Sequence, residues 1–186
     1  MDIESIINNI AILPQQSLEE LIAITETVKF PKGYLISQAG KTEHFTYFIS
    51  MGLVRAFQYK DGDEVTFWFG KEGDTVLSMR SYIEDKPSYE NIESLEELTA
   101  YKLNNSDLRK LYEKDIHIAN WGRKLAEREL LRTEENFISR QFKTATERYE
   151  ELIKTHPHLL QRVQLGYIAS YLGITQVSLS RIRASI

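Results

Sequence analysis

A stretch near the C-terminus, residues 165–184, has side chains suited to hydrogen bonding with bases and phosphates. Its second half carries Arg181 and Gln176 together with several hydroxyl side chains, and it contains no acidic residue. Arginine can donate two hydrogen bonds to guanine, and glutamine can bond in the same way to adenine, at base edges exposed in the major groove. We therefore expect one helix face to contact duplex DNA. The predicted contact residues are Thr175, Gln176, Val177, Ser178, Ser180, Arg181 and Arg183.

The apolar residues of the same stretch predict a helix-turn-helix. Two helices that cross through a tight turn need a small residue at their contact, a glycine at the turn and an aliphatic residue that locks the second helix. Ala169, Gly173 and Leu179 meet these needs in that order. Thr175 is a suitable N-cap for the second helix. The other positions expected to be buried are Ile168, Leu172, Ile174 and Ile182. An ordinary helical hairpin is the alternative interpretation.

Charge is distributed unevenly along the chain. The formal net charge is −4, from 23 basic and 27 acidic residues. The acids end at Glu151, so residues 1–151 carry 19 cations against 27 acids, and the last 35 residues carry four cations and no acid. The C-terminal part can therefore approach a polyanion that the rest of the protein repels.

The composition excludes several classes of protein. With 186 residues, 42% hydrophobic residues and 27% charged residues, the chain has the composition of a folded globular protein. There is no run of 18 apolar residues and no cationic leader, so we expect neither a signal peptide nor a membrane span, and a cytoplasmic location. The absence of cysteine excludes disulfides, cysteine-bound zinc, iron–sulfur clusters and thiol catalysis.

Short helices followed by many strands are predicted for the first hundred residues. Ser17 and Glu20 have the spacing of a capping box that would begin a helix at Leu18. From about Thr25 the hydrophobic period is two, and six of the nine glycines fall between residues 33 and 73, which is typical of a jelly roll or barrel. The expected strands are 25–30, 34–38, 44–50, 53–60, 63–69, 74–77, 89–93 and 98–103.

A short helix over 107–112 and a long helix over about 115–142 are predicted next. Apolar and small residues recur along the long helix with steps of three and four, which is the pattern of a heptad seam. A second stripe lies beside it at Ile118, Trp121 and Leu125. The seam predicts pairing with a second copy of the chain; the alternative is that both stripes pack on the β domain. The predicted dimer residues are Ile116, Ala119, Arg123, Ala126, Leu130, Thr133 and Phe137.

The order of these elements resembles the Crp/Fnr regulators, the relatives of the cyclic AMP receptor protein. The segment TYFISMGLVRAFQYKDGDE (46–64) is similar to that family's two strands and hairpin, and GKEGDTV (70–76) to the stretch before its phosphate-binding cassette. LTAYKLNNSDLRKLYEKD (98–115) is similar to the strand and helix that precede its dimer helix.

The resemblance implies an α+β fold with a cyclic-nucleotide-binding-like jelly roll at 1–112, a dimerisation helix at 113–142 and a helix-turn-helix at 143–186. No wing is expected after the recognition helix, because the sequence stops at Ile186. It also implies a homodimeric, sequence-specific DNA-binding transcription regulator. The partners that it implies are double-stranded DNA, a second copy of the chain, RNA polymerase and an unknown small-molecule effector.

The cassette departs from the cyclic-nucleotide-binding pattern, in which a glutamate binds the ribose and an arginine the phosphate. Ser78 and Ser88 stand at the positions that the resemblance gives to that glutamate and that arginine. A buried phosphate without its cation loses a charge-assisted hydrogen bond of about 1.5–3 kcal/mol. Cyclic AMP is therefore not the expected effector. The residues predicted to line an effector pocket are Ser78, Met79, Arg80, Ser81, Ser88 and Tyr89.

Other functions find less support in the sequence. A haem sensor would need axial ligands, for which His44 and His117 are isolated candidates. A cupin-type enzyme would need several histidines on neighbouring strands, but only His44 lies in the strand region. We therefore expect no catalysis, metal or cofactor. A sensor module that binds a small molecule or a protein, but not DNA, remains the alternative function.

Overall fold

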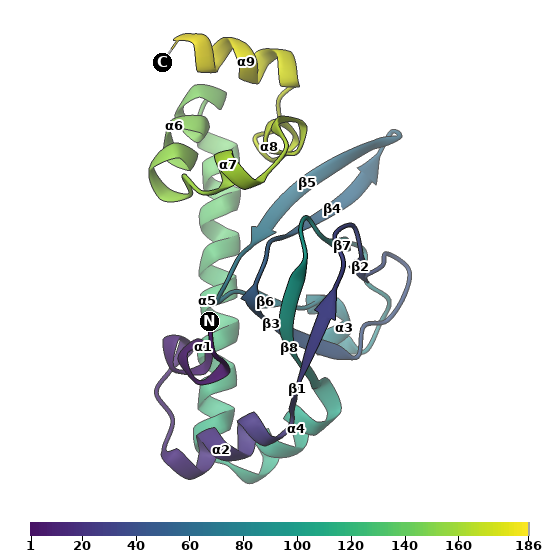
Figure 1. The fold of residues 1–186 in the computed structure, drawn as a ribbon, viewed down its shortest axis with the longest axis vertical. Coiled ribbons are helices and arrows are strands. Elements are labelled where there is room, and N and C mark those ends of the chain that lie inside the picture. Colours follow the sequence, from purple (N-terminus) through teal and green to yellow (C-terminus); the bar gives the residue numbers. More distant parts are fainter. Residues whose placement is uncertain (186) are drawn as a thin grey trace. The chain divides into compact units, whose positions relative to one another are not determined.

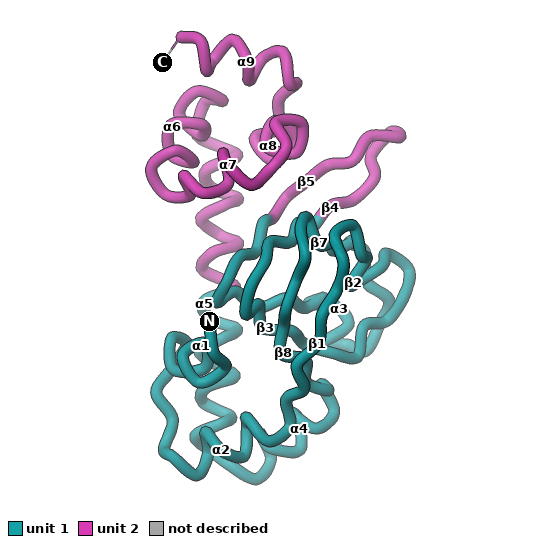
Figure 2. Tube along the Cα trace, viewed as in Figure 1, with its two compact units in different colours: residues 1–56, 69–128 teal, residues 57–68, 129–186 magenta. Residues whose placement is uncertain are grey.

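The computed structural model describes residues 1–185; Ile186 lies outside the described residues. The chain packs as two compact units (Figure 2). The first consists of Met1–Ala56 and Phe69–Arg128, and the second of Phe57–Trp68 and Glu129–Ile186. These are units of packing, and the predicted division by role at residues 112 and 142 stays a prediction.

Two helices open the first unit (Figure 1): α1 (Ile3–Ile10) and α2 (Gln15–Ala23). The Asp2 carboxylate caps α1 by accepting a hydrogen bond of 2.8 Å from the Ser5 amide. The predicted capping box at Ser17 is wrong, because α2 begins earlier, directly after Pro14, whose φ of −56° suits a helix start. Ser17 is instead buried within α2, and its hydroxyl donates to Asp115 over 2.6 Å.

The strands form two four-stranded sheets, ordered β1-β8-β3-β6 and β2-β7-β4-β5. Each predicted strand is present, with its ends shifted by no more than two residues, because short alternating segments between glycine turns leave little freedom in where a strand ends. Their bounds are β1 (Thr25–Phe30), β2 (Leu35–Ser37), β3 (Phe45–Met51), β4 (Val54–Lys60), β5 (Asp63–Gly70), β6 (Thr75–Val76), β7 (Asn91–Ser94) and β8 (Leu98–Asn104).

Tight turns join the central strands. Gly52, between β3 and β4, has a φ of +115°, and a Cβ there would lie 2.7 Å from the Glu97 carbonyl oxygen, so a side chain does not fit. The β4–β5 hairpin closes through Asp61 and Gly62, which both have positive φ. An Asp-Gly pair in this conformation matches the twist of the two strands that it connects.

Further helices complete the first unit: α3 (Met79–Glu84), α4 (Asn105–Lys114) and the beginning of α5 (Ile116–Phe142). The buried stripe of α5 lies in the core, where the Trp121 ring packs edge-on against Phe48 at 6.0 Å and its indole N–H donates to the Ile7 carbonyl oxygen over 3.0 Å. Gly122 is explained by the same packing, because a Cβ there would overlap the phenol of Tyr112.

The second unit contains the rest of α5, followed by α6 (Ala145–Thr155), α7 (Leu159–Arg162), α8 (Leu165–Tyr171) and α9 (Gln176–Ser185). Thr144 and Glu147 form a complete capping box that begins α6. The tip of the β4–β5 hairpin also packs with these helices, although it is far from them in sequence. Within residues 1–185 no helix is long and apolar enough to cross a membrane.

Candidate DNA-binding site

The predicted helix-turn-helix is present as α8 and α9. The turn between them contains Gly173 with a φ of +69°, and the Ile174 amide donates back to the Ala169 carbonyl oxygen over 3.0 Å. Ala169 and Leu179, which were predicted to form the contact between the helices, are buried. Of the other predicted apolar positions, Ile168 and Leu172 are buried, while Ile174 and Ile182 are half-buried at the edge of the contact.

Thr175 begins α9 as the sequence predicts. Its hydroxyl oxygen accepts a hydrogen bond of 3.1 Å from the Ser178 amide, which is the usual geometry of a threonine N-cap. The Thr175 and Ser178 hydroxyls also bond to each other over 2.9 Å. These bonds fix the first turn of α9, where free amide groups and the helix dipole favour an anion.

The outer face of α9 is open to solvent. Gln176, Ser180, Arg181 and Arg183 are exposed, and Ser178 is half-buried because its hydroxyl takes part in the cap. Val177 also points outward, with 62% of its surface exposed. The predicted contact residues therefore lie together on the exposed face of α9, except that Ser178 is partly covered.

The predicted seam of α5 is also largely exposed. Ile116, Leu130 and Phe137 are 68%, 69% and 58% exposed, whereas the second stripe at Ile118, Trp121 and Leu125 is buried. Ala119 is half-buried, and Arg123, Ala126 and Thr133 are exposed. Only the second stripe therefore packs within the described chain, which argues against the alternative that both stripes cover the β domain.

The comparisons agree with this architecture. Residues 27–115 match the cyclic nucleotide-binding domain family. FixK2 from Bradyrhizobium japonicum superposes with a TM-score of 0.76 at 20% identity, covering 87% of this chain and 84% of that one. The c-di-GMP-responsive global regulator CLP from Xanthomonas campestris has a TM-score of 0.71 at 18% identity, covering 92% and 91%.

A Eubacterium rectale protein described as a transcriptional regulator of the Crp/Fnr family has a TM-score of 0.73 at 14% identity, covering 93% of this chain and 83% of that one. The chain has the Crp/Fnr fold. Among curated proteins, none matches the chain in sequence.

The cassette of this Crp/Fnr-like chain has a buried serine and a buried carboxylate at and beside the position expected for a phosphate-binding arginine. Ser88, at the position expected for the phosphate-binding arginine, is buried, and its hydroxyl donates to the Glu90 carbonyl oxygen over 2.8 Å. Glu90 itself is buried, and one of its carboxylate oxygens has no hydrogen-bond partner among the described residues. A buried carboxylate next to this position would repel the phosphate of a cyclic nucleotide.

The other predicted pocket residues divide into two groups. Ser78 and Ser81 are buried; the Ser81 hydroxyl donates to the Lys86 carbonyl oxygen, and the Ser78 hydroxyl has no partner among residues 1–185. Met79 is half-buried, while Arg80 and Tyr89 are exposed. The structure therefore places Arg80 and Tyr89 at the surface and Ser78, Ser81 and Ser88 in the interior, and the effector pocket stays a prediction.

The candidate haem ligands of the sequence, His44 and His117, are both exposed. His44 lies 3.3 Å from the Asp85 carboxylate, and His117 lies at the start of α5. In the part of the chain that the structure describes, no three His, Asp or Glu side chains are grouped so that they could hold a metal ion.

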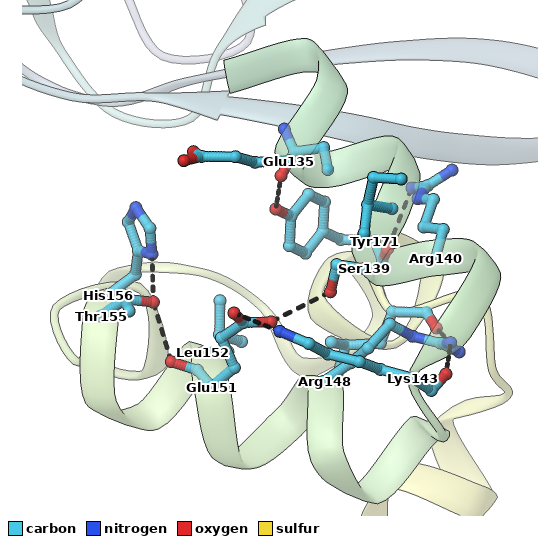
Figure 3. A pocket seen from close by; sticks show the side chains of 13 residues that line it. Glu135, Ser139, Arg140, Lys143, Arg148, Glu151, Leu152, Thr155, His156 and Tyr171 are labelled. Atoms are coloured by element: carbon cyan, nitrogen blue, oxygen red, sulfur yellow. Dashed lines mark hydrogen bonds and ion pairs between the residues drawn. The ribbon is translucent and has the colours of Figure 1, made fainter. Parts of the chain in front are cut away.

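A polar network connects α5 and α6 to the helix-turn-helix. It surrounds a cavity of about 450 Å³ between α5, α6 and the end of α8 (Figure 3). The Glu151 carboxylate accepts hydrogen bonds from Lys143 at 2.6 Å and Ser139 at 3.0 Å, and the Lys143 bond is the main cause of a lowered Glu151 pKa. Arg148 donates to the carbonyl oxygens of Lys143 and Leu172 at 2.6 and 2.8 Å.

Because these lining groups bond to one another, the network holds the helices in place. Arg148 connects the corner between α5 and α6 with the turn of the helix-turn-helix. Sequence reasoning missed Arg148, because a single arginine on a helix carries no sign of bonds to distant carbonyl groups. Glu151 was missed as well, because the bonds of its carboxylate to Ser139 and Lys143 depend on how α5 and α6 fold together.

Proposed function

We propose that this protein is a sequence-specific DNA-binding transcription regulator that acts as a homodimer. The observation that carries the proposal is the outer face of α9: Arg181 and Gln176 are exposed on a helix that Leu179 locks into place, and that face contains no acid. Hydrogen-bond donors without nearby carboxylates suit a surface that meets phosphates and base edges. The Crp/Fnr fold agrees with this role.

In this proposal the base edges are contacted by Gln176, Val177 and Arg181. Arg181 donates two hydrogen bonds to a guanine, and Gln176 pairs with an adenine. Val177 has no polar group, and the apolar group that the major groove offers is the thymine methyl. We therefore assign Val177 to a thymine. Thr175, Ser178 and Arg183, with the first turn of α9, bind phosphates.

The exposed seam of α5 supports the proposed homodimer. Leu130 and Phe137 present apolar surface in line with Ile116, and an isologous pair of such helices would bury it. Two recognition helices about 34 Å apart would then enter successive major grooves of a near-palindromic site. The effector is unknown, and the buried Glu90 carboxylate argues against cyclic AMP.

The proposal is tested by selecting duplexes from a random pool with the purified full chain and measuring binding at several salt concentrations. A DNA-binding dimer gives a selected, near-palindromic site, and affinity falls steeply with salt because several counterions are released. Arg181→Ala should lose about 1–3 kcal/mol of binding free energy at one base pair and should discriminate less between bases at that position. Failure to enrich any site, with binding equally weak for Arg181→Ala and wild type, would leave the non-DNA sensor module as the function.

A further inference from the structure

Ser170 binds the β4–β5 hairpin to the first helix of the helix-turn-helix. Ser170, near the end of α8, accepts a hydrogen bond of 2.9 Å from the Thr66 amide, and its hydroxyl donates to the Glu64 carbonyl oxygen over 2.8 Å. β5 is an edge strand in its sheet, so these backbone groups face away from the sheet. One hydroxyl therefore bonds to both a donor and an acceptor of the β5 backbone.

Two arginines of α5 strengthen this junction. One guanidinium nitrogen of Arg140 donates to the Thr66 carbonyl oxygen at 3.1 Å and to the Tyr171 carbonyl oxygen at 3.0 Å, so it joins β5 to the end of α8. The Arg132 guanidinium lies over the Trp68 ring, 5.4 Å from its centroid. Thr66 is completely buried. Both backbone groups of Thr66 thus have partners from helices that lie far along the chain.

We propose that Ser170 is a positioning residue for DNA recognition, because it makes the hairpin part of the DNA-binding unit. The same two strands, β4 and β5, continue into the first unit through residues 54–56 and 69–70. A conformational change in this sheet would therefore be transmitted to α8, because the backbone of β5 is continuous and is hydrogen-bonded to Ser170. This inference rests on the proposed DNA-binding function for its consequence, and on the Ser170 contacts for its structural basis.

Amide hydrogen exchange of the full chain tests the junction directly. In Ser170→Ala the segment 63–68 should exchange about fivefold to tenfold faster, because the hydrogen bond from the Thr66 amide to the Ser170 hydroxyl is lost. The segment 171–175, at the turn of the helix-turn-helix, should accelerate with it. Ser170→Thr keeps the hydroxyl and should restore both. Ser50→Ala is the matched control, since it removes an exposed serine hydroxyl bonded at 2.7 Å in the first unit.

The positioning role is tested by adding the selected duplex. Coupling is reciprocal, so DNA bound at α9 should slow exchange at 63–68 in wild type and in Ser170→Thr, and leave it unchanged in Ser170→Ala. Arg140→Gln, an exposed substitution, should weaken the response in the same direction. A DNA-bound wild type with unchanged exchange at 63–68, or a Ser170→Ala protein that responds like wild type, would overturn the proposal.

If no duplex is selected, the proposed DNA-binding function is wrong. Amide hydrogen exchange of the protein without DNA then still tests the structural role of Ser170. In that case the positioning role requires 63–68 and 171–175 to accelerate together in Ser170→Ala. Acceleration confined to 63–68 would show that the hairpin detaches without consequence for the helix-turn-helix, and the inference would be wrong.

Discussion

Removing one methyl group from the DNA is the sharpest test of the assignment of Val177 to thymine. The perturbation is the replacement of a single thymine by deoxyuridine in each half of the selected site, which leaves every hydrogen-bonding group of the base in place. Val177 is 62% exposed in the free protein, so it has apolar surface to bury against a methyl group. Burying one such group contributes about 0.8 kcal/mol, or about a fourfold change in affinity.

A symmetric dimer doubles this effect. Substituting the thymine in both half-sites should therefore weaken binding by about 15-fold, since two contributions of about 0.8 kcal/mol add when the positions are far apart. Deoxyuridine is moved through all thymine positions, and affinity is measured by fluorescence anisotropy at fixed salt. Val177→Ala is then measured on the same duplexes.

The result expected is one sensitive position in each half-site, whose sensitivity disappears in Val177→Ala. The remaining positions serve as internal controls. Wild-type affinity that is the same for every deoxyuridine duplex would refute the assignment, and so would a sensitive position that stays equally sensitive in Val177→Ala. Either result would leave Arg181 and Gln176 to account for base recognition.

Three further variants test the seam, the core and the support of the helix-turn-helix. Leu130→Asp places a charge on the exposed seam and should give monomers with weakened DNA affinity; an intact dimer in analytical ultracentrifugation would count against the seam. Gly122→Ala usually stabilises a helix by about 1 kcal/mol, but here its Cβ meets Tyr112, so unfolding in urea should show a net loss of about 1–2 kcal/mol; a gain would contradict that packing. Glu151→Gln removes the carboxylate whose pKa is lowered below 4.5 by the Lys143 ammonium, so the stability advantage of wild type should be full above pH 4.5 and shrink as the pH falls below it; an advantage independent of pH in thermal unfolding would exclude that contribution.

Local patterns allowed much of the fold to be predicted from the sequence. The strands follow from alternation between glycine turns, and the helix-turn-helix from Ala169, Gly173 and Leu179, because these features depend on neighbours a few residues away. The two stripes of α5 also followed from spacing alone. The capping box at Ser17 failed because a second pattern competes with it: Pro14 begins the helix one turn earlier, and Ser17 then turns inward to Asp115.

The parts of the site that could not be predicted depend on contacts between distant residues. Ser170 looks in sequence like an ordinary polar residue on a helix, and its role depends on the β5 backbone, 104 residues away. Thr66 is the polar residue between Val65 and Phe67 in its strand, yet it is completely buried, with partners from helices of the second unit. The interior of the cassette was also beyond local reasoning, since the burial of Glu90 depends on how the whole β domain closes around it.

The hydrogen bonds between the β4–β5 hairpin and the helices determine which fragments of this protein would keep their native contacts. A fragment that starts at Lys143 would retain both helices of the helix-turn-helix but would lack Arg140 and the β5 backbone. Its Ser170 hydroxyl would then lose the hydrogen bond from the Thr66 amide, and its Tyr171 carbonyl oxygen would lose the one from Arg140. Chimeras that exchange C-terminal domains between relatives would meet the same mismatch. The helix-turn-helix of this chain should therefore be transferred together with residues 57–68.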